Sequence, residues 1–303
     1  MARSRTGIND LPDSLLCLIL SRVPLDQAIR CSVISKRWRF LWRYLPNLRF
    51  SEEIFYSSAR LFEIQNIIDG ILKWHSVPLE LFQFYGLISF VVSRAKINEW
   101  IHHAALKDVR KISLQFHREV EVPNSVFFCT KLRYLCLRNF RLENMPGSCG
   151  GFACLETLYL LYIKLNDKTL ELMLQLCPVL KVLVVGNCHG VQRVKVCSGS
   201  LIFLHLDFPS SSNGIRAITA SCPRLVSLAI KVPYHVEKMK FELPACLHLS
   251  TTAAQLDPFT TLKSLRKMTI LSVIYQGDVS CLHKFPDLNQ ICIDNAKYRA
   301  RLS

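Results

Sequence analysis

The stretch Leu180-Lys181-Val182-Leu183-Val184-Val185-Gly186-Asn187-Cys188 decides the fold, because its spacing of apolar residues recurs along most of the chain. The same Leu-x-x-Leu-x-Leu template begins at Leu132, Leu155, Leu201, Leu225, Leu265 and Leu288, and more loosely at Leu79 and Val109. From Val109 to Leu225 the first positions are 23, 23, 25, 21 and 24 residues apart. A period in this range is typical of stacked repeats. The wider gap after Leu225 is expected to hide one degenerate unit near Cys246.

Each repeat is predicted to contain a short strand, a turn and a helix. Lead-ins such as Cys177-Pro178 and Cys222-Pro223 end one unit and start the next strand, because proline cannot continue a helix. Residues 167–176 have helical spacing of their leucines. The pattern resembles leucine-rich repeats, which implies an α/β fold in which residues 79–303 form a curved solenoid with a parallel sheet on its inner face.

The positions between the repeated leucines are the predicted capture surface for a protein substrate. Side chains alternate across a strand, so these positions face outward when the leucines face the core. Aromatic and arginine side chains are enriched in protein interfaces. The candidates at these positions are Arg133, Tyr134, Tyr159, Phe203 and His205. The alternative is that these rings only cover neighbouring strands.

The N-terminal segment has a different pattern, with three short amphipathic helices expected within fifty residues. The stretch from Asp10 to Pro24 carries leucines at helical spacing, and a second short helix follows Pro24. A third helix is expected from Trp38 until Pro46 stops it. So small a bundle has little core, and it would gain stability by burying one face against another protein.

Leu11-Pro12-Asp13-x-Leu15-Leu16 and Val33-x-Ser35-Lys36-Arg37-Trp38-Arg39-x-Leu41-Trp42 resemble the two ends of the plant F-box motif. The resemblance implies a three-helix F-box at 8–50 that docks on the SKP-type adaptor, and through it on the cullin-RING scaffold of an SCF ubiquitin ligase. The family motif places Leu11 and Pro12 in the adaptor's groove, with Leu15, Ile19 and Trp38 supporting that face.

The order of segments extends this resemblance over nearly the whole chain. Residues 51–78 are expected to form a helical linker or first cap, followed by repeats with Cys-Pro-x-Leu lead-ins. This order is similar to plant F-box proteins with leucine-rich repeats, many of which end in a further FBD segment. We expect no complete FBD segment here. The resemblance implies a substrate receptor without catalytic residues of its own, located in the nucleus, the cytoplasm or both.

Composition narrows the remaining possibilities. The thirteen cysteines include no Cys-x-x-Cys pair, so we expect reduced core residues and no metal site. No run of about 18 apolar residues predicts a membrane span. We expect no cofactor, since no dinucleotide, P-loop or nucleophile motif occurs.

The net charge is +15, and nine Lys or Arg against three Asp in residues 1–50 place +6 of it there. A positive surface of this kind can meet an acidic protein partner, which is the interpretation we favour. We expect no specific nucleic-acid binding. The alternative function is a basic leucine-rich scaffold that binds nucleic acid or an anionic small molecule without a ligase role.

Overall fold

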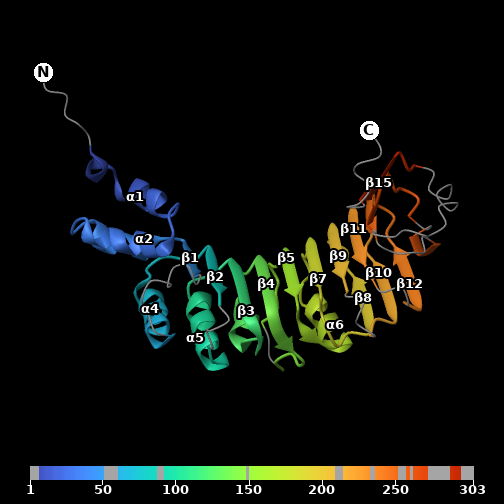
Figure 1. Cartoon of the computed structure of the whole chain (residues 1–303), viewed down its shortest axis with the longest axis horizontal. Helices are drawn as coiled ribbons and strands as arrows, with labels where there is room; N and C mark the ends of the chain where they lie inside the picture. The colour runs from blue at the N-terminus through green and yellow to red at the C-terminus, as the bar shows by residue number, and fades with distance from the viewer. Residues whose placement is uncertain are drawn as a thin grey trace, which may run out of the picture. The chain divides into compact units, whose positions relative to one another are not determined.

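The structure is a computed structural model that describes residues 7–50, 61–86, 92–147, 150–208, 214–232, 236–251, 257–259, 262–271 and 287–294. Its contacts divide the chain into two compact units. Unit 1 comprises Met1–Arg118 and Val122–Leu132, and unit 2 comprises Glu119–Glu121 and Arg133–Ser303. Both combine helices with parallel strands (Figure 1), so the predicted α/β class is confirmed.

Unit 1 begins with the helices of the F-box segment and continues into a small sheet. Its helical elements are η1 (Ile8–Asp10), α1 (Asp13–Leu20), α2 (Leu25–Arg30), η2 (Cys31–Val33), η3 (Trp38–Tyr44), α4 (Leu61–Trp74), α5 (Arg94–Ala105) and η4 (Asn124–Phe128). Its strands are β1 (Asn47–Phe50), β2 (Leu81–Tyr85) and β3 (Lys111–Glu121), the last of which reaches into unit 2.

The third helix expected between Trp38 and Pro46 is present as η3, which is a 3₁₀-helix. Three residues per turn place Trp38 and Leu41 on one side, and both are buried, whereas Tyr44 on the next turn is 49% exposed. The 3₁₀ geometry therefore buries the two apolar residues that matter.

The strands of unit 1 pair in parallel in the order β1-β2-β3 and confirm two of the looser repeats. Leu48, Phe82 and Ile112 are in register across the sheet, and each has 0% of its surface exposed. Helix α5 adds Trp100 to this core, with its ring 5.3 Å from that of Phe84. The core therefore includes both the end of the F-box segment and the first repeats.

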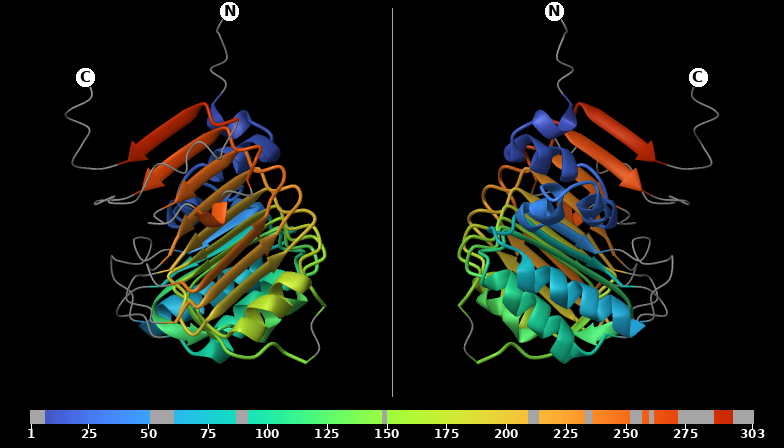
Figure 2. Two further views of the ribbon diagram at one scale, coloured as in Figure 1. Left: turned by 90° about the vertical axis from the view of Figure 1, so that its right-hand side faces the viewer. Right: turned by 90° about the vertical axis from the view of Figure 1, so that its left-hand side faces the viewer.

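Unit 2 is built on a run of parallel strands that follow one another in sequence (Figures 1 and 2). They are β4 (Tyr134–Leu142), β5 (Thr157–Leu161), β7 (Val182–Gly186), β9 (Phe203–Asp207), β11 (Ser227–Lys231), β13 (His248–Thr251), β14 (Lys267–Leu271) and β15 (Gln290–Asp294). The two-residue β6 (Lys164–Leu165) pairs with the end of β4. The remaining elements are α6 (Asp167–Gln175) and η5 (Asp257–Phe259).

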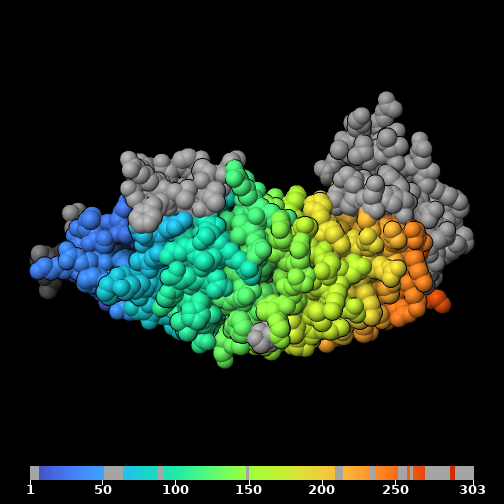
Figure 3. Space-filling view, turned by 90° about the horizontal axis from the view of Figure 1, so that it is seen from below, coloured from blue at the N-terminus to red at the C-terminus, as the bar shows by residue number. Residues whose placement is uncertain are grey.

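The repeat template predicts the register of these strands correctly. The central leucine of each unit aligns with that of the next, and all have 0% exposure: Leu135, Leu158, Leu183, Leu204 and Leu228. The degenerate unit is also confirmed, because Cys246 and Leu249 are buried at the template positions before and within β13. In Figure 3, the described repeats of unit 2, coloured from light green to orange, lie side by side.

The prediction that every repeat carries a helix is wrong. Within the described part of unit 2, α6 is the single α-helix, and three other repeats return through a second strand instead. These strands are β8 (Arg193–Cys197), β10 (Ala217–Ser221) and β12 (Lys238–Glu242), which pair in parallel in the order β12-β10-β8. Their buried side chains alternate with exposed ones, a period of two that favours a strand over a helix.

Two glycines give opposite expectations for substitution by alanine. Gly190 has a φ of +88°, and an added Cβ would lie 2.7 Å from the carbonyl oxygen of Leu165. We expect Gly190→Ala to destabilise unit 2 by about 1–3 kcal/mol. Gly70 lies in α4 with nothing within 4 Å of its added Cβ, so Gly70→Ala should stabilise by about 0.5–1 kcal/mol. Urea unfolding of both variants checks the pair, and equal effects would contradict it.

Candidate docking surfaces

The F-box segment leaves much of its apolar surface exposed. On α1, Leu16 and Leu20 are buried, whereas Leu15, Leu18 and Ile19 are 44%, 54% and 40% exposed. These three residues share one helix face, since they are three and four positions apart. The turn after α2 exposes Val33 to 87%. An exposed apolar face of this kind is a candidate protein-interaction surface, and it includes the predicted residues Leu15 and Ile19.

The short segment that carries Leu11 and Pro12 is held in place by Arg37. The Arg37 guanidinium donates to Asp13 Oδ1 at 2.7 Å, to the Leu11 carbonyl at 2.5 Å and to the Asn9 carbonyl. These bonds fix the backbone on both sides of Pro12, which is exposed. Arg37 belongs to the F-box-like motif, but the sequence did not predict that it would hold this segment. The charge pattern gave no signal for this role, because its acceptors are mainly backbone carbonyls.

Trp38 lies beneath the exposed residues and is not itself at the surface. Its side chain is 3% exposed, and its Nε1 donates to Asn9 Oδ1 at 2.8 Å. It therefore supports the same segment from the core side while Arg37 holds it from outside. Direct contact of Trp38 with an adaptor stays a prediction, as do the adaptor contacts of Leu11, Pro12, Leu15 and Ile19.

The F-box segment is joined to the end of α4 by polar and aromatic contacts. His75 Nε2 lies 2.8 Å from the Leu45 carbonyl, and the Ser76 amide donates to the Arg43 carbonyl at 2.9 Å. The Arg43 guanidinium lies over the rings of Phe40 at 4.3 Å and Trp74 at 5.0 Å, a cation–π arrangement. The F-box segment is thereby tied to the helix that precedes the sheet.

The buried His75 makes stability depend on pH. Burial lowers the pKa of His75 most, and the nearby Lys107 charge lowers it further, although the Leu45 carbonyl opposes both. The unfolded chain then binds a proton near pH 6.5 that the folded chain resists, so the free energy of unfolding should fall as pH drops below that value. One proton limits the slope to about 1.4 kcal/mol per pH unit.

We expect His75→Gln to flatten this dependence in unfolding curves measured between pH 7.5 and pH 5. His205 also has its pKa lowered by burial, so the parent protein and the variant should share a residual slope. The difference between their curves isolates His75. Two superimposable slopes would contradict the assignment.

On the sheet of unit 2, two of the predicted capture residues meet. The rings of Tyr134 and Tyr159 on the neighbouring strands β4 and β5 are 5.6 Å apart between centroids and tilted by 41°. Both side chains are half-buried, in the outward rows between the buried leucines. Next to them, the Arg138 guanidinium lies 4.8 Å from the centre of the Tyr162 ring. Rings and guanidinium groups fixed in this way lose little freedom on binding.

The other predicted residues lie apart from this pair. Phe203 and His205 are on β9, and strand β7 separates them from Tyr159. Arg133 precedes β4, where its guanidinium lies 3.8 Å from Glu156, which also accepts from Lys181 at 2.7 Å. The repeat that begins at Leu180 lies between those at Leu155 and Leu201 in the sequence, so its strand β7 intervenes, with Val182 and Val184 in the outward rows. The outward rows of the unit 2 sheet therefore carry two separate groups, the tyrosine pair on β4 and β5 and the Phe203–His205 site on β9.

The His, Cys, Asp and Glu side chains of the described residues do not form a metal site. No group of three or more His, Cys, Asp or Glu side chains there could hold a metal ion. Ten of the cysteines in this part are free thiols, and burial raises the pKa of Cys129, Cys177 and Cys188 to about 12, which keeps them protonated and unreactive. None of the helices described is long and apolar enough to cross a bilayer.

Two family models match the chain. The F-box domain model matches residues 8–50. A model described as the leucine-rich repeats of the FBD-associated F-box protein At5g56370 matches residues 97–245. The two matches cover the segment with the exposed apolar residues and most of the aligned strands described above.

Relatives from Arabidopsis thaliana have the same two parts. The F-box/FBD/LRR-repeat protein At1g13570 is 28% identical over 247 residues, covering 80% of this chain and 58% of the relative. The F-box/FBD/LRR-repeat protein At5g56420 is 33% identical over 215 residues, covering 68% of this chain and 50% of the relative. The chain thus spans about half the length of these relatives. It belongs to the family of plant F-box proteins with leucine-rich repeats that are related to the FBD-associated proteins.

Proposed function

We propose that this chain is a substrate receptor of an SCF ubiquitin ligase, with no catalytic residues of its own. The observation that carries the proposal is the exposed apolar face of α1 next to a Leu11-Pro12 segment held by Arg37. An exposed apolar face is stabilised when a partner covers it, and the F-box match names the kind of partner that would do so. That partner is the SKP-type adaptor, which bridges to the cullin-RING scaffold.

The repeats would capture the protein to be ubiquitinated. We infer that they stack as a curved solenoid, because every described repeat contributes one parallel strand in the same register. The outward rows offer the tyrosine pair and the Phe203–His205 site as anchors. Ubiquitination is a nuclear and cytoplasmic process, so the protein would act in one or both of these compartments.

Reciprocal variants test the two roles in one experiment. We expect the double change Leu11→Ala and Pro12→Ala to weaken adaptor binding about tenfold or more, since each buried apolar side chain contributes about 1.5–3 kcal/mol. Proteins held by the repeats should still co-purify. Tyr159→Ala with Phe203→Ala should do the opposite, keeping adaptor and cullin while losing the captured proteins.

The measurement is quantitative mass spectrometry of proteins that co-purify with the tagged full chain, with circular dichroism to show that both variants are folded. Unchanged recovery of the adaptor with the first variant would contradict the proposed docking role of Leu11 and Pro12. If the second variant recovers the same captured proteins as the parent chain, substrate binding does not depend on this face.

The positive charge of the chain supports nucleic-acid binding, the alternative function, less well than the structure supports a substrate receptor. Several basic side chains are already paired with carboxylates on other repeats, as in Lys164 with Glu143 and Lys195 with Glu171. Binding to nucleic acid would weaken steeply and log-linearly with salt through release of counterions. Tight binding of random RNA or DNA that persists near physiological salt would favour this alternative over protein capture.

A further inference from the structure

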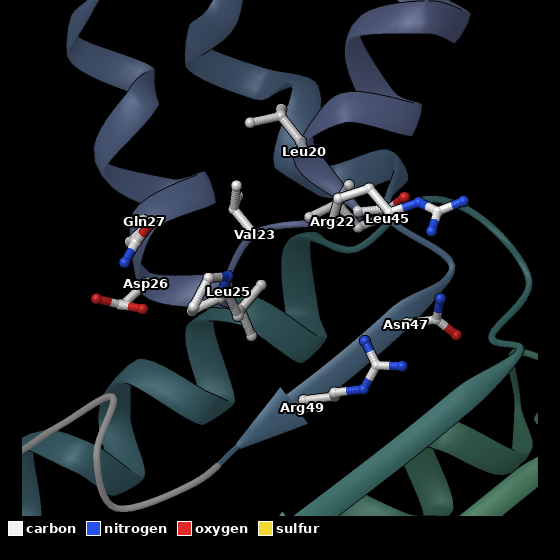
Figure 4. A pocket seen from close by; sticks show the side chains of 11 residues that line it. Leu20, Arg22, Val23, Leu25, Asp26, Gln27, Leu45, Asn47 and Arg49 are labelled. Carbon is white, nitrogen blue, oxygen red and sulfur yellow. The ribbon is translucent and has the colours of Figure 1, made fainter.

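A pocket lies where the F-box segment meets the first strand of unit 1 (Figure 4). It is formed by the turn between α1 and α2 on one side and by residues 45–49 on the other, and its volume is about 500 Å³. This volume falls in the range of small-molecule sites, which is about 300–1,000 Å³. None of the residues proposed to contact the adaptor lines it.

The polar groups of the pocket are arranged by charge. In the view of Figure 4, the guanidinium groups of Arg22 and Arg49 and the amide of Asn47 lie at one side, and Asp26 lies at the other. Asp26 is the one carboxylate in the lining, and it faces Arg30 at 3.9 Å. Within the described residues, no carboxylate pairs with Arg22 or Arg49. Two positive charges without a carboxylate partner among the described residues therefore share one end of the pocket.

The wall beside these charges is apolar. Leu25 and Leu45 line it with side chains that are 5% and 2% exposed, so the core holds them in place. Val23, which is 36% exposed, lines it as well. The arginines come from sequence positions 22 and 49, one in the α1–α2 turn and one on β1. Because Leu48 and Phe50 on either side of Arg49 are fully buried, the backbone that carries this arginine is fixed.

We propose that this pocket binds a small organic anion, with its carboxylate or phosphate group between Arg22 and Arg49 and its apolar part against Leu45 and Val23. Planar guanidinium groups bind both kinds of anion through paired N–H donors. The Asn47 amide adds a neutral donor at the same end. This site is independent of the ligase role, because it needs neither the adaptor face nor the outward rows of unit 2.

Isothermal titration of the full chain with phenyl phosphate and with benzoate tests the site at low ionic strength. Each probe combines an anionic group with a ring, and the tighter of the two identifies the preferred anion. Inorganic phosphate lacks the ring and benzyl alcohol lacks the charge. We expect saturable binding of at least one anionic probe, weaker binding of inorganic phosphate and none of benzyl alcohol.

Three single variants locate the binding. Arg22→Gln and Arg49→Gln should each weaken the preferred probe about fivefold or more, through loss of a charge-assisted hydrogen bond at a partly exposed site. Arg39→Gln removes an equally exposed arginine that does not line the pocket, and it should change the affinity less than twofold. Equal affinities in all three variants, the absence of saturable binding, or binding of benzyl alcohol as tight as that of the anions would overturn the proposal.

Discussion

Leu158→Ala is expected to destabilise unit 2 by about 2–5 kcal/mol, the range for truncation of a fully buried leucine. Leu158 has 0% exposure and lies in register between Leu135 on β4 and Leu183 on β7. The cavity would therefore open in the middle of a stack of identical side chains. Parallel strands on both sides limit how far the neighbours can move to fill it.

All four tryptophans lie in unit 1, at positions 38, 42, 74 and 100. Their fluorescence therefore reports on unit 1 and not on unit 2, which carries the Leu158 substitution. The loss should be measured by urea unfolding followed by far-ultraviolet circular dichroism. Leu172→Ala is the matched control, because it removes the same atoms from a side chain on α6 that is 37% exposed. It should cost less than about 1 kcal/mol. Equal losses in the two variants would refute the assignment of Leu158 to the core of the repeats.

Trp38→Ala should destabilise the F-box segment by about 3–5 kcal/mol, the range for removal of a buried tryptophan. It removes a side chain that is 3% exposed and the donor to Asn9 Oδ1 at 2.8 Å. Because Asn9 and Arg37 together hold the Leu11-Pro12 segment, its docking geometry should be lost as well. Adaptor binding should fall although no exposed residue has changed.

Hydrogen exchange measured by mass spectrometry follows this loss locally, through faster exchange of peptides from α1 and α2. Trp38→Phe provides the control, since it keeps most of the packing and removes only the Nε1 donor to an exposed acceptor. That variant should lose about 0.5–1.5 kcal/mol. If Trp38→Ala leaves exchange in α1 unchanged, Trp38 does not support the surface.

Some features of this protein follow from its sequence alone. The Leu-x-x-Leu-x-Leu spacing determined which side chains are buried in each strand and which residues align between strands, because a period of two fixes the face and a constant repeat length fixes the register. The same spacing located the degenerate unit around Cys246 and Leu249. The sequence also predicted that the N-terminal module would leave an apolar face uncovered, since so small a module has little core, but it did not separate the buried Leu16 and Leu20 from the exposed Leu15 and Leu18.

Other features were decided only by the tertiary structure. The returning half of a repeat can be a helix or a second strand, and β8, β10 and β12 form because each finds a neighbour with free hydrogen-bonding groups, a condition that local propensity does not contain.

The candidate sites show the same division. The order of the repeats already places β7 between Tyr159 and Phe203, whereas the contact between the rings of Tyr134 and Tyr159 is seen only in the structure. Arg37 acts through backbone carbonyls of Asn9 and Leu11 that are 28 and 26 residues away in the chain. A sequence carries no sign of such acceptors, because every residue has a carbonyl and only the fold brings these two within reach of one guanidinium group.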